Sequence, residues 1–331
     1  MVVRVRIQVA EFPIVATTFA KQIMIAALIV PIALKFLTGL VRRHVQELNE
    51  YLRGCWARPN TPLFKKMTMA KAYDYKDLTF VIPIHIDSIV RLENLVMVVD
   101  CLKQLNANIV IHECGKYGNR IIRNHFTRKK NTTYLFSTSD DVVFYRTAII
   151  NKTMKYVTTP FVSVWDADVI VDCKQIQESM DCLRLEQCDI SFPYDGDFLN
   201  VDYVFRECYF KNRDIRLLCK HFKYFNRLYG DNFVGGGFLI NRIKYIKSGS
   251  ENEKFYGWGP EDLDRVLRWH NMGFHVHRSK GPMFHLCHPR DSNGYMRSEI
   301  HNDLCTLQLA NSRYSSQEEI KKRANNNRLF L

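Results

Sequence analysis

Residues 256–264 contain an indole that stands between two glycines. A proline follows, and three of the next four residues are acids. The residues concerned are Gly257, Trp258, Gly259, Pro260, Glu261, Asp262 and Asp264. Proline and acids both favour the first turn of a helix, so capping alone would explain the proline and one acid. An aromatic ring beside carboxylates also suits a sugar, because the ring covers its apolar face and the acids bind its hydroxyls. The segment predicts a helix start that can also bind a sugar.

Two further acids, Asp166 and Asp168, follow the apolar run 161–165. Carboxylates at the end of a buried strand are unfavourable without a partner. Their usual partners are a hard divalent cation and the phosphates that it bridges. An ordinary polar strand end is the alternative, because Asp-x-Asp also occurs by chance. The position after a buried strand favours the metal site.

His285 and His288 lie three residues apart, a spacing that can bind a metal ion. Nitrogen ligands favour manganese over magnesium, with zinc as a minor alternative. Taken alone, such a pair is more often an ordinary surface or core feature, and Cys287 between the two is expected to pack inward. The three glycines 235–237 allow the backbone to approach a ligand closely, or else form a bulge or turn.

The composition limits the class of protein. The 331 residues suffice for one large domain or two small ones. Lys and Arg number 47 against 34 Asp and Glu, a formal charge of +13, and residues 1–75 carry eleven basic and four acidic side chains. The chain has no zinc-finger spacing and no basic helix with a dimerisation repeat. We therefore expect nucleotide phosphates or anionic lipids as partners, and no nucleic acid.

The ten cysteines are scattered through apolar segments and include no Cys-x-x-Cys pair. This pattern is typical of reduced thiols in a cytosolic domain. Residues 19–41 are largely apolar, but the uninterrupted run 23–34 is shorter than the roughly 20 residues that span a bilayer. We predict an interfacial or single-span anchor, with a helix packed on the soluble domain as the alternative. No small-residue cleavage site follows, so a clean signal peptide is not indicated.

From residue 78 onward the chain alternates between strand and helix patterns. We expect strands at 78–84, 108–112 and 161–165, and helices at 89–102 and 144–156. This order predicts an α/β fold with a parallel sheet, which binds ligands at the carboxyl ends of its strands. The chain lacks a glycine-rich phosphate loop, which argues against a dinucleotide-binding enzyme or an ordinary kinase. Leu263, Val266 and Leu267 follow Pro260 at helical spacing and can face a core.

In this order the motifs resemble those of GT-A glycosyltransferases, specifically the β-1,4-galactosyltransferase family with its related bacterial capsule and chondroitin-type transferases. Residues 257–264 are similar to the family's Trp-Gly-Trp-Gly-Gly-Glu-Asp-Asp-Asp signature, and residues 166–168 to its Asp-Val-Asp. Residues 144–151 resemble a Phe-x-Arg-x-x-x-x-Asn segment on the nucleotide side. Residues 233–239 resemble a Tyr-Phe-Gly-Gly strand, and residues 285–288 stand where the family has Met-x-x-His.

The resemblance covers residues 78–290 and implies a GT-A fold, a Rossmann-like nucleotide-binding mixed sheet flanked by helices. It also implies roles for the matching residues. The metal ligands would be Asp168, His285 and His288, binding Mn²⁺ or Mg²⁺. The general base would be Asp262. The substrate-binding residues would be Glu261, Trp258, Asp264, Gly236 and Gly237. The nucleotide-binding residues would be Pro83, His85, Arg91, Phe144, Arg146 and Asp166.

The implied reaction is transfer of a hexose or N-acetylhexosamine, with inversion, from a UDP-sugar of the UDP-Gal or UDP-GalNAc type. The acceptor would be a glycan or glycolipid in capsule or other polysaccharide synthesis. Leu263 stands where the family has an acid, so its sugar specificity does not carry over, and His285 replaces a methionine. The alternatives are a non-catalytic carbohydrate-binding protein of the same fold and a sugar-nucleotide pyrophosphorylase, although residues 85–89 lack the glycine-rich loop that the latter requires.

The chain is expected to contain four parts. These are an apolar and basic segment 1–44 that could anchor it, a linker 45–76, the GT-A domain 77–290 and a basic tail 291–331. Because the family's lumenal stem and disulfides are not evident, we expect a bacterial enzyme in the cytoplasm, associated with the inner face of the cell membrane through the first segment.

Overall fold

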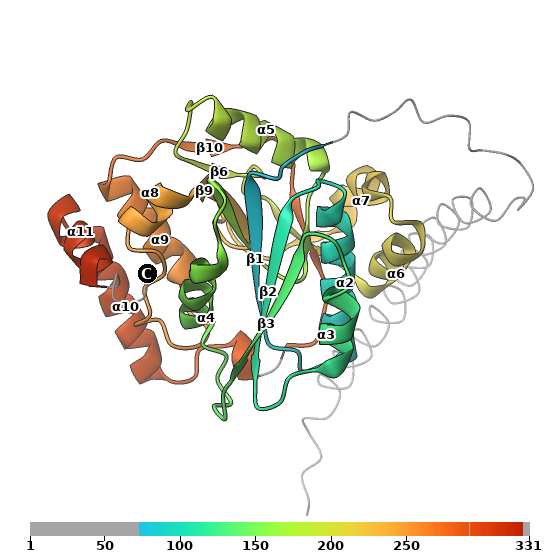
Figure 1. Cartoon of the computed structure of the whole chain (residues 1–331), viewed down its shortest axis with the longest axis horizontal. Helices are drawn as coiled ribbons and strands as arrows, with labels where there is room; N and C mark the ends of the chain where they lie inside the picture. The colour runs from blue at the N-terminus through green and yellow to red at the C-terminus, as the bar shows by residue number, and fades with distance from the viewer. Residues whose placement is uncertain (1–72, 291, 327–331) are drawn as a thin grey trace, which may run out of the picture. The chain divides into compact units, whose positions relative to one another are not determined.

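A computed structural model describes residues 73–290 and 292–326 (Figure 1). The chain divides into two compact units, residues 1–70 and 71–331, and the described residues belong to the second. The predicted anchor at residues 19–41 and the whole segment 1–44 lie outside the described residues. Within the described part, no helix combines the length and the apolar character needed to cross a membrane.

The strands of the described residues form a seven-stranded and a four-stranded sheet. The strands are β1 (Leu78–Ile84), β2 (Asn108–Gly115), β3 (Thr132–Thr138), β4 (Phe161–Trp165), β5 (Val169–Ile170), β6 (Ile190–Phe192), β7 (Phe198–Val201), β8 (Asn226–Arg227), β9 (Gly237–Asn241), β10 (Val276–Arg278) and β11 (Met283–Leu286). The three strands that the sequence predicts correspond to β1, β2 and β4, and all three belong to the larger sheet.

The larger sheet has the order β10-β6-β9-β4-β1-β2-β3. Its strands run parallel except β9, which pairs antiparallel with β4 and with β6. Every residue of β1 is buried, as expected for a parallel strand that is covered on both faces. The domain therefore has the mixed α/β sheet of a GT-A fold, and the parallel sheet expected from the strand pattern alone contains one reversed strand.

Helices cover both faces of this sheet. The helices are α2 (Ile89–Lys103), α3 (Arg120–Phe126), α4 (Arg146–Thr153), α5 (Cys173–Arg184), α6 (Tyr203–Asn212), α7 (Ile215–His221), α8 (Arg242–Lys247), α9 (Glu261–Asn271), α10 (Glu299–Arg313) and α11 (Gln317–Asn326). In Figure 1, α2 and α3 lie to one side of strands β1 to β3, while α4, α8 and α9 lie to the other. The expected helix at 144–156 consists of α4 followed by a short 3₁₀ turn at Met154–Tyr156.

The smaller sheet has the order β5-β11-β7-β8 and begins where the chain leaves the larger one. β4 ends at Trp165 and β5 begins at Val169, so the connection between the two sheets consists of Asp166, Ala167 and Asp168. The indole Nε1–H of Trp165 donates to the carbonyl of Val169 at 3.1 Å and closes this connection. The two acids therefore lie at the carboxyl end of a central strand, beside the second sheet.

α9 buries a different face from the one that its hydrophobic pattern predicts. Leu263 is 43% exposed, and Val266 and Leu267 are only partly buried, so the expectation of an apolar inner face was wrong. The buried residues of α9 are instead Glu261, Asp264, Arg265, Arg268 and Trp269. Charged side chains can occupy this face because each one meets an opposite charge or a hydrogen-bond partner on a neighbouring segment.

Arg265 and Arg268 show how the buried charges of α9 are compensated. Nη1 of Arg265 donates to Oε1 of Glu251 at 2.7 Å, and Glu251 is fully buried. Nε of Arg268 donates to Oδ2 of Asp264 at 2.9 Å, within the helix. Ser312 on α10 donates its hydroxyl to Oδ1 of the same aspartate at 2.6 Å. The inner face of α9 is thus a network of ion pairs and hydrogen bonds.

The residues after 290 contain two helices that the sequence analysis did not predict. α10 packs against α9, and α11 packs against α8. Asn271 at the end of α9 donates to the carbonyls of Ser312 and Ser315, at 2.8 and 3.0 Å. The segment predicted as a basic tail therefore contributes ordered helices to the described unit.

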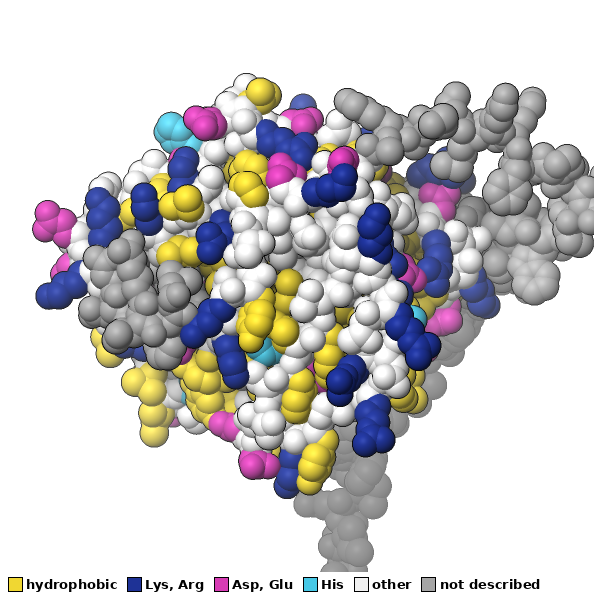
Figure 2. All heavy atoms as spheres, viewed as in Figure 1, with side chains coloured by type: hydrophobic (Ala, Val, Ile, Leu, Met, Phe, Trp, Pro, Cys, Tyr) yellow, Lys and Arg dark blue, Asp and Glu magenta, His cyan; other side chains and the backbone are white. Residues whose placement is uncertain are grey.

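Charged side chains are broadly distributed on the face that Figure 2 shows. On the face shown in Figure 2, Lys and Arg side chains are spread over the surface among neutral and apolar ones, with acidic side chains between them. The view agrees with the excess of basic residues in the sequence, and on this face the excess is not gathered at one place.

Candidate active site

A cavity of about 550 Å³ opens at the carboxyl ends of β1 and β4. It collects side chains from the start of α2, the start of α4, the connection between the two sheets, the start of α9, and β11 with the loop after it. The predicted site residues that line it are Pro83, His85, Arg91, Phe144, Arg146, Asp166, Asp168, Gly236, Trp258, Glu261, Asp262, His285 and His288. The fold therefore brings residues of five separate sequence motifs to one cavity.

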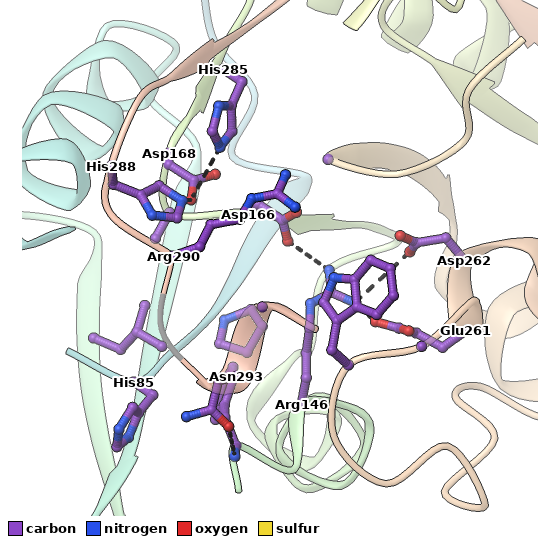
Figure 3. Close-up of a pocket in the computed structure, with 18 of the residues that line it drawn as sticks. His85, Arg146, Asp166, Asp168, Glu261, Asp262, His285, His288, Arg290 and Asn293 are labelled. Carbon is purple, nitrogen blue, oxygen red and sulfur yellow. Dashed lines mark hydrogen bonds and ion pairs between the residues drawn. The ribbon is translucent and has the colours of Figure 1, made fainter. Parts of the chain in front are cut away.

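Asp168, His285 and His288 form one side of the cavity (Figure 3). One ligand atom from each residue lies within 4.8 Å of the other two. Nε2 of His288 is 3.0 Å from Oδ2 of Asp168, and Nε2 of His285 is 3.9 Å from the same oxygen. The strand register explains this proximity: His285 on β11 pairs with Val169 on β5, the residue directly after Asp168.

Hydrogen bonds fix the orientation of both imidazole rings. Nδ1–H of His285 donates to Oδ1 of Asn200 at 2.9 Å, and Nδ1–H of His288 donates to the carbonyl of Pro289 at 2.8 Å. An amide or carbonyl oxygen can only accept, so in each neutral ring Nε2 presents its lone pair toward Asp168. A metal-bound histidine usually donates its other ring nitrogen to an oxygen in this way. The donor set therefore fits a divalent cation.

The ionisation of these three groups also fits metal binding. Burial lowers the pKa of His285 to about 4, so this ring is neutral at physiological pH. Burial opposes ionisation of Asp168, but His285 and His288 outweigh it and lower the pKa of this carboxyl. Burial also opposes protonation of His288, and the hydrogen bond to Asp168 outweighs it and raises the pKa of the ring. A cation at this place would compete with the proton shared by His288 and Asp168.

Arg146 lies between the metal half of the cavity, formed by Asp168, His285 and His288, and the acidic half, formed by Glu261 and Asp262. This first residue of α4 contacts three acidic side chains: Nη2 is 2.6 Å from Asp166, and Nη1 is 3.4 Å from Glu261 and 3.8 Å from Asp262. Burial opposes the charge of Arg146, but these neighbouring carboxylates raise its pKa well above the usual value. Figure 3 shows Asp166 and Arg146 between the histidines on one side and Glu261 and Asp262 on the other.

Two of these carboxyl groups have raised pKa values. Burial raises the pKa of Asp166 to about 6. The positive charge of Arg146 acts to lower this pKa, and the negative charge of Asp168 acts to raise it. Burial, together with the charge of Asp262, raises the pKa of Glu261 to about 8. Oε2 of Glu261 is buried without a hydrogen-bond partner among the described residues. Glu261 is therefore mostly protonated at neutral pH, and its free oxygen could bind a hydroxyl of a ligand.

Asp262 is the most accessible acid of the α9 segment and forms ion pairs with two arginines. Its side chain is 22% exposed, and Oδ1 interacts with Arg265 and Arg146. Trp258 is 39% exposed and also lines the cavity. Gly257, with φ of +88°, lets the chain turn directly before the indole. The segment thus presents an aromatic ring and a carboxylate to the same cavity.

Two predicted substrate-binding residues lie elsewhere. Asp264 is fully buried, pairs with Arg268 and Ser312, and does not line the cavity. Gly237 pairs with Trp165, and a β-carbon at this glycine would lie 2.6 Å from the indole, so its smallness makes room for a core side chain. The structure thus gives both residues a packing role, since neither reaches the cavity.

Several residues that line the cavity were missed by the sequence analysis. The rings of Tyr229 and Phe233 stack with their centroids 4.2 Å apart, and both lie beside Phe198. Arg290 approaches the hydroxyl of Tyr229 at 3.3 Å, and the side-chain oxygen of Asn293 accepts from the backbone of Phe144 at 2.8 Å. Phe233 begins the segment 233–239 that resembles the Tyr-Phe-Gly-Gly strand, whereas no signal in the sequence distinguished Tyr229 and Phe198 from core aromatic residues. The position of Arg290, two residues after His288, was a further indication.

Comparison with known proteins agrees with this geometry. Residues 216–289 match the family model described as the N-terminal domain of galactosyltransferase. This match includes the three glycines, the 256–264 segment and both histidines, whereas Asp166 and Asp168 lie before it. No curated protein matches the chain.

Among solved structures, the catalytic domain of Drosophila β1,4-galactosyltransferase 7 in complex with xylobiose is 16% identical, with a TM-score of 0.44. The match covers 73% of this chain and 82% of that one. The family match and the sheet order together indicate a glycosyltransferase with a galactosyltransferase-like GT-A fold. The expected resemblance and fold class are thereby confirmed.

Proposed function

We propose that the protein is an inverting glycosyltransferase that moves a hexose or N-acetylhexosamine from a UDP-sugar to a glycan or glycolipid acceptor. One observation carries the proposal. The Asp168, His285 and His288 cluster faces the carboxyl groups of Glu261 and Asp262 within one cavity, and Arg146 lies between the two groups. A cation-binding half suits a diphosphate, and an acidic half beside an indole suits sugar hydroxyls.

Asp168, His285 and His288 would bind the cation, with Mn²⁺ favoured because two of the three ligands are nitrogens. When bound, the cation stabilises negative charge on the leaving diphosphate. Arg91 lines the same part of the cavity and adds a positive charge there. Pro83, His85, Phe144 and Asp166 would surround the nucleoside on the side of β1 and α4.

Asp262 would act as the general base. The acceptor hydroxyl attacks the anomeric carbon, the bond from that carbon to the phosphate oxygen breaks, and UDP leaves with the bonding electrons. The hydroxyl proton passes to the carboxylate of Asp262. The ion pairs with Arg265 and Arg146 orient this carboxylate, and Trp258 would stack on a sugar. Glu261, protonated at neutral pH, would donate a hydrogen bond to the donor or acceptor sugar.

The test measures UDP release and product formation from UDP-Gal, UDP-GalNAc, UDP-Glc, UDP-GlcNAc and UDP-GlcA, with and without Mn²⁺. We expect metal-dependent UDP release from one or two donors, faster when a glycan acceptor is present. Binding of UDP-sugars without turnover of any donor would favour a non-catalytic carbohydrate-binding protein. Formation of a nucleoside triphosphate from a UDP-sugar and pyrophosphate would favour a pyrophosphorylase.

A further inference from the structure

The backbone between His285 and His288 is bonded to a side chain outside the cavity. Asn94 on α2 is fully buried. Its Nδ2 donates to the carbonyl of Leu286 at 2.9 Å and lies 3.5 Å from the carbonyl of Cys287. These are the two residues that separate the histidines. The side-chain amide of Asn94 therefore restrains the link, the two-residue segment 286–287, which sets the spacing of the two imidazoles.

A buried arginine determines which way this amide points. Arg206 on α6 is 1% exposed, and its Nε donates to Oδ1 of Asn94 at 2.8 Å. A guanidinium can only donate, so the oxygen of Asn94 must face Arg206 and the nitrogen must face β11. The other guanidinium nitrogens bond to Glu93, at 2.7 Å, and Glu207, at 2.8 Å. The orientation of Asn94 is thereby fixed by an arginine whose three nitrogens are each hydrogen-bonded.

The backbone amides of Leu286 and Cys287 are also hydrogen-bonded. The amide of Leu286 donates to the carbonyl of Asp168 at 2.7 Å, and the amide of Cys287 donates to the carbonyl of Val201 at 3.2 Å. The two backbone amides between the histidines thus donate hydrogen bonds to Asp168, an aspartate of the metal site, and to β7. Asn94 bonds to the acceptors of the same two residues. His288 follows directly, with its Nε2 3.0 Å from Asp168.

We propose that Asn94, oriented by Arg206, is a positioning residue for the metal site. It fixes the backbone between His285 and His288 so that both Nε2 atoms converge on Asp168. This inference rests on the proposed function, because it assumes that the three residues bind a cation. Substituting a partner that orients metal ligands typically weakens metal binding about 10- to 100-fold. We expect Asn94→Ala to raise the dissociation constant for Mn²⁺ by that factor.

The experiment titrates Mn²⁺ into the wild-type protein and variants, with free Mn²⁺ followed by electron paramagnetic resonance and stability by urea unfolding without metal. The matched control is Asn271→Ala. Asn271 also donates its side-chain amide to backbone carbonyls, those of Ser312, Arg313 and Ser315, but lies outside the cavity. Both variants should lose stability, whereas only Asn94→Ala should lose Mn²⁺ affinity. Asn271→Ala should remain within about twofold of the wild type.

The outcomes separate the two proposals. A wild-type protein that does not bind Mn²⁺ would overturn the metal assignment and the positioning role with it. Tight binding by the wild type and unchanged binding by folded Asn94→Ala would overturn the positioning role alone. If Asn94→Ala does not fold, Asn94→Leu combined with Arg206→Met removes both buried partners, so that no unpaired arginine remains. This double variant should show the same loss of Mn²⁺ affinity, and unchanged affinity would refute the inference.

Discussion

Asp262 is placed to accept a proton because it combines exposure to the cavity with fixed orientation. Its carboxylate is paired with Arg265 and Arg146, whereas the neighbouring Asp264 is enclosed in the core. We predict that Asp262→Asn lowers transfer by about 10²- to 10⁴-fold, the usual contribution of a general base. UDP affinity should stay near the wild-type value, because the nucleotide side of the cavity is unchanged. Steady-state transfer and UDP titration measure the two effects, and an equal loss of both would exclude the role as base.

The raised pKa of Glu261 predicts that the stability of the protein depends on pH. Folding raises its pKa from 4.5 to about 8, so between these values the folded protein holds a proton that the unfolded chain releases. The resulting stabilisation is fully present below pH 4.5 and is lost as the pH rises through 8. At full effect the free energy of unfolding falls by about 1.4 kcal/mol per pH unit.

Glu261→Gln should remove this contribution, because the amide is neutral at every pH and has nearly the same shape. Urea unfolding at pH 5, 6, 7 and 8 measures it as the difference in slope between the two proteins. Other groups, such as Asp166, titrate in both and cancel in the difference. Parallel slopes for wild type and variant would show that Glu261 is ionised in the folded state.

At the scale of elements, the site depends on close contact between β9 and the connection from β4 to β5. The carbonyl of Gly236 accepts from the amide of Asp166 at 2.8 Å. Gly236 has φ of +83°, and a β-carbon there would lie 2.5 Å from Sδ of Met283 and 2.7 Å from the ring of Phe198. Both the backbone conformation and the space available therefore require glycine.

We predict that Gly236→Ala destabilises the protein more than Gly273→Ala does. Gly273 has φ of +71°, and a β-carbon there would meet nothing within 4 Å, so this control measures backbone strain alone, about 1–2 kcal/mol. The collision at Gly236 should add about 1–3 kcal/mol. Urea unfolding of both variants checks the difference. Equal losses would show that Met283 and Phe198 move aside at little cost.

At the scale of the whole molecule, we propose that residues 1–44 attach the enzyme to the inner face of the cell membrane. The apolar run and the two arginines that follow it motivate the proposal. The full chain should then sediment with membranes and require detergent for release, whereas a chain that lacks residues 1–44 should remain in the supernatant. A high-salt wash is the control for purely electrostatic attachment. A full-length protein that stays in solution without detergent would refute the anchor.

The sequence predicted the elements that depend on local pattern. The apolar runs at β1, β2 and β4 indicate buried strands, because short runs rich in β-branched residues suit a parallel sheet that is covered on both faces. Likewise, Pro260 and the acids after it predict the start of α9, since both favour the first helical turn. The residue types of the metal and acidic groups were also visible, but their short spacings alone left ordinary surface or core roles open.

The tertiary structure decided which of these residues meet. The antiparallel register of β5 and β11 brings His285 beside Asp168, and no local pattern encodes the pairing of such short strands. It also decided which face of α9 is buried. Arg265 and Arg268 can be buried because Glu251 and the carbonyl of Ser248, which lie outside the helix, accept their hydrogen bonds, and the apolar pattern of α9 does not encode these partners. For the same reason Asp264 belongs to the core and Asp262 to the cavity. The sequence alone thus determined the chemistry available to this protein, and only the packing of distant segments determined which groups can act together.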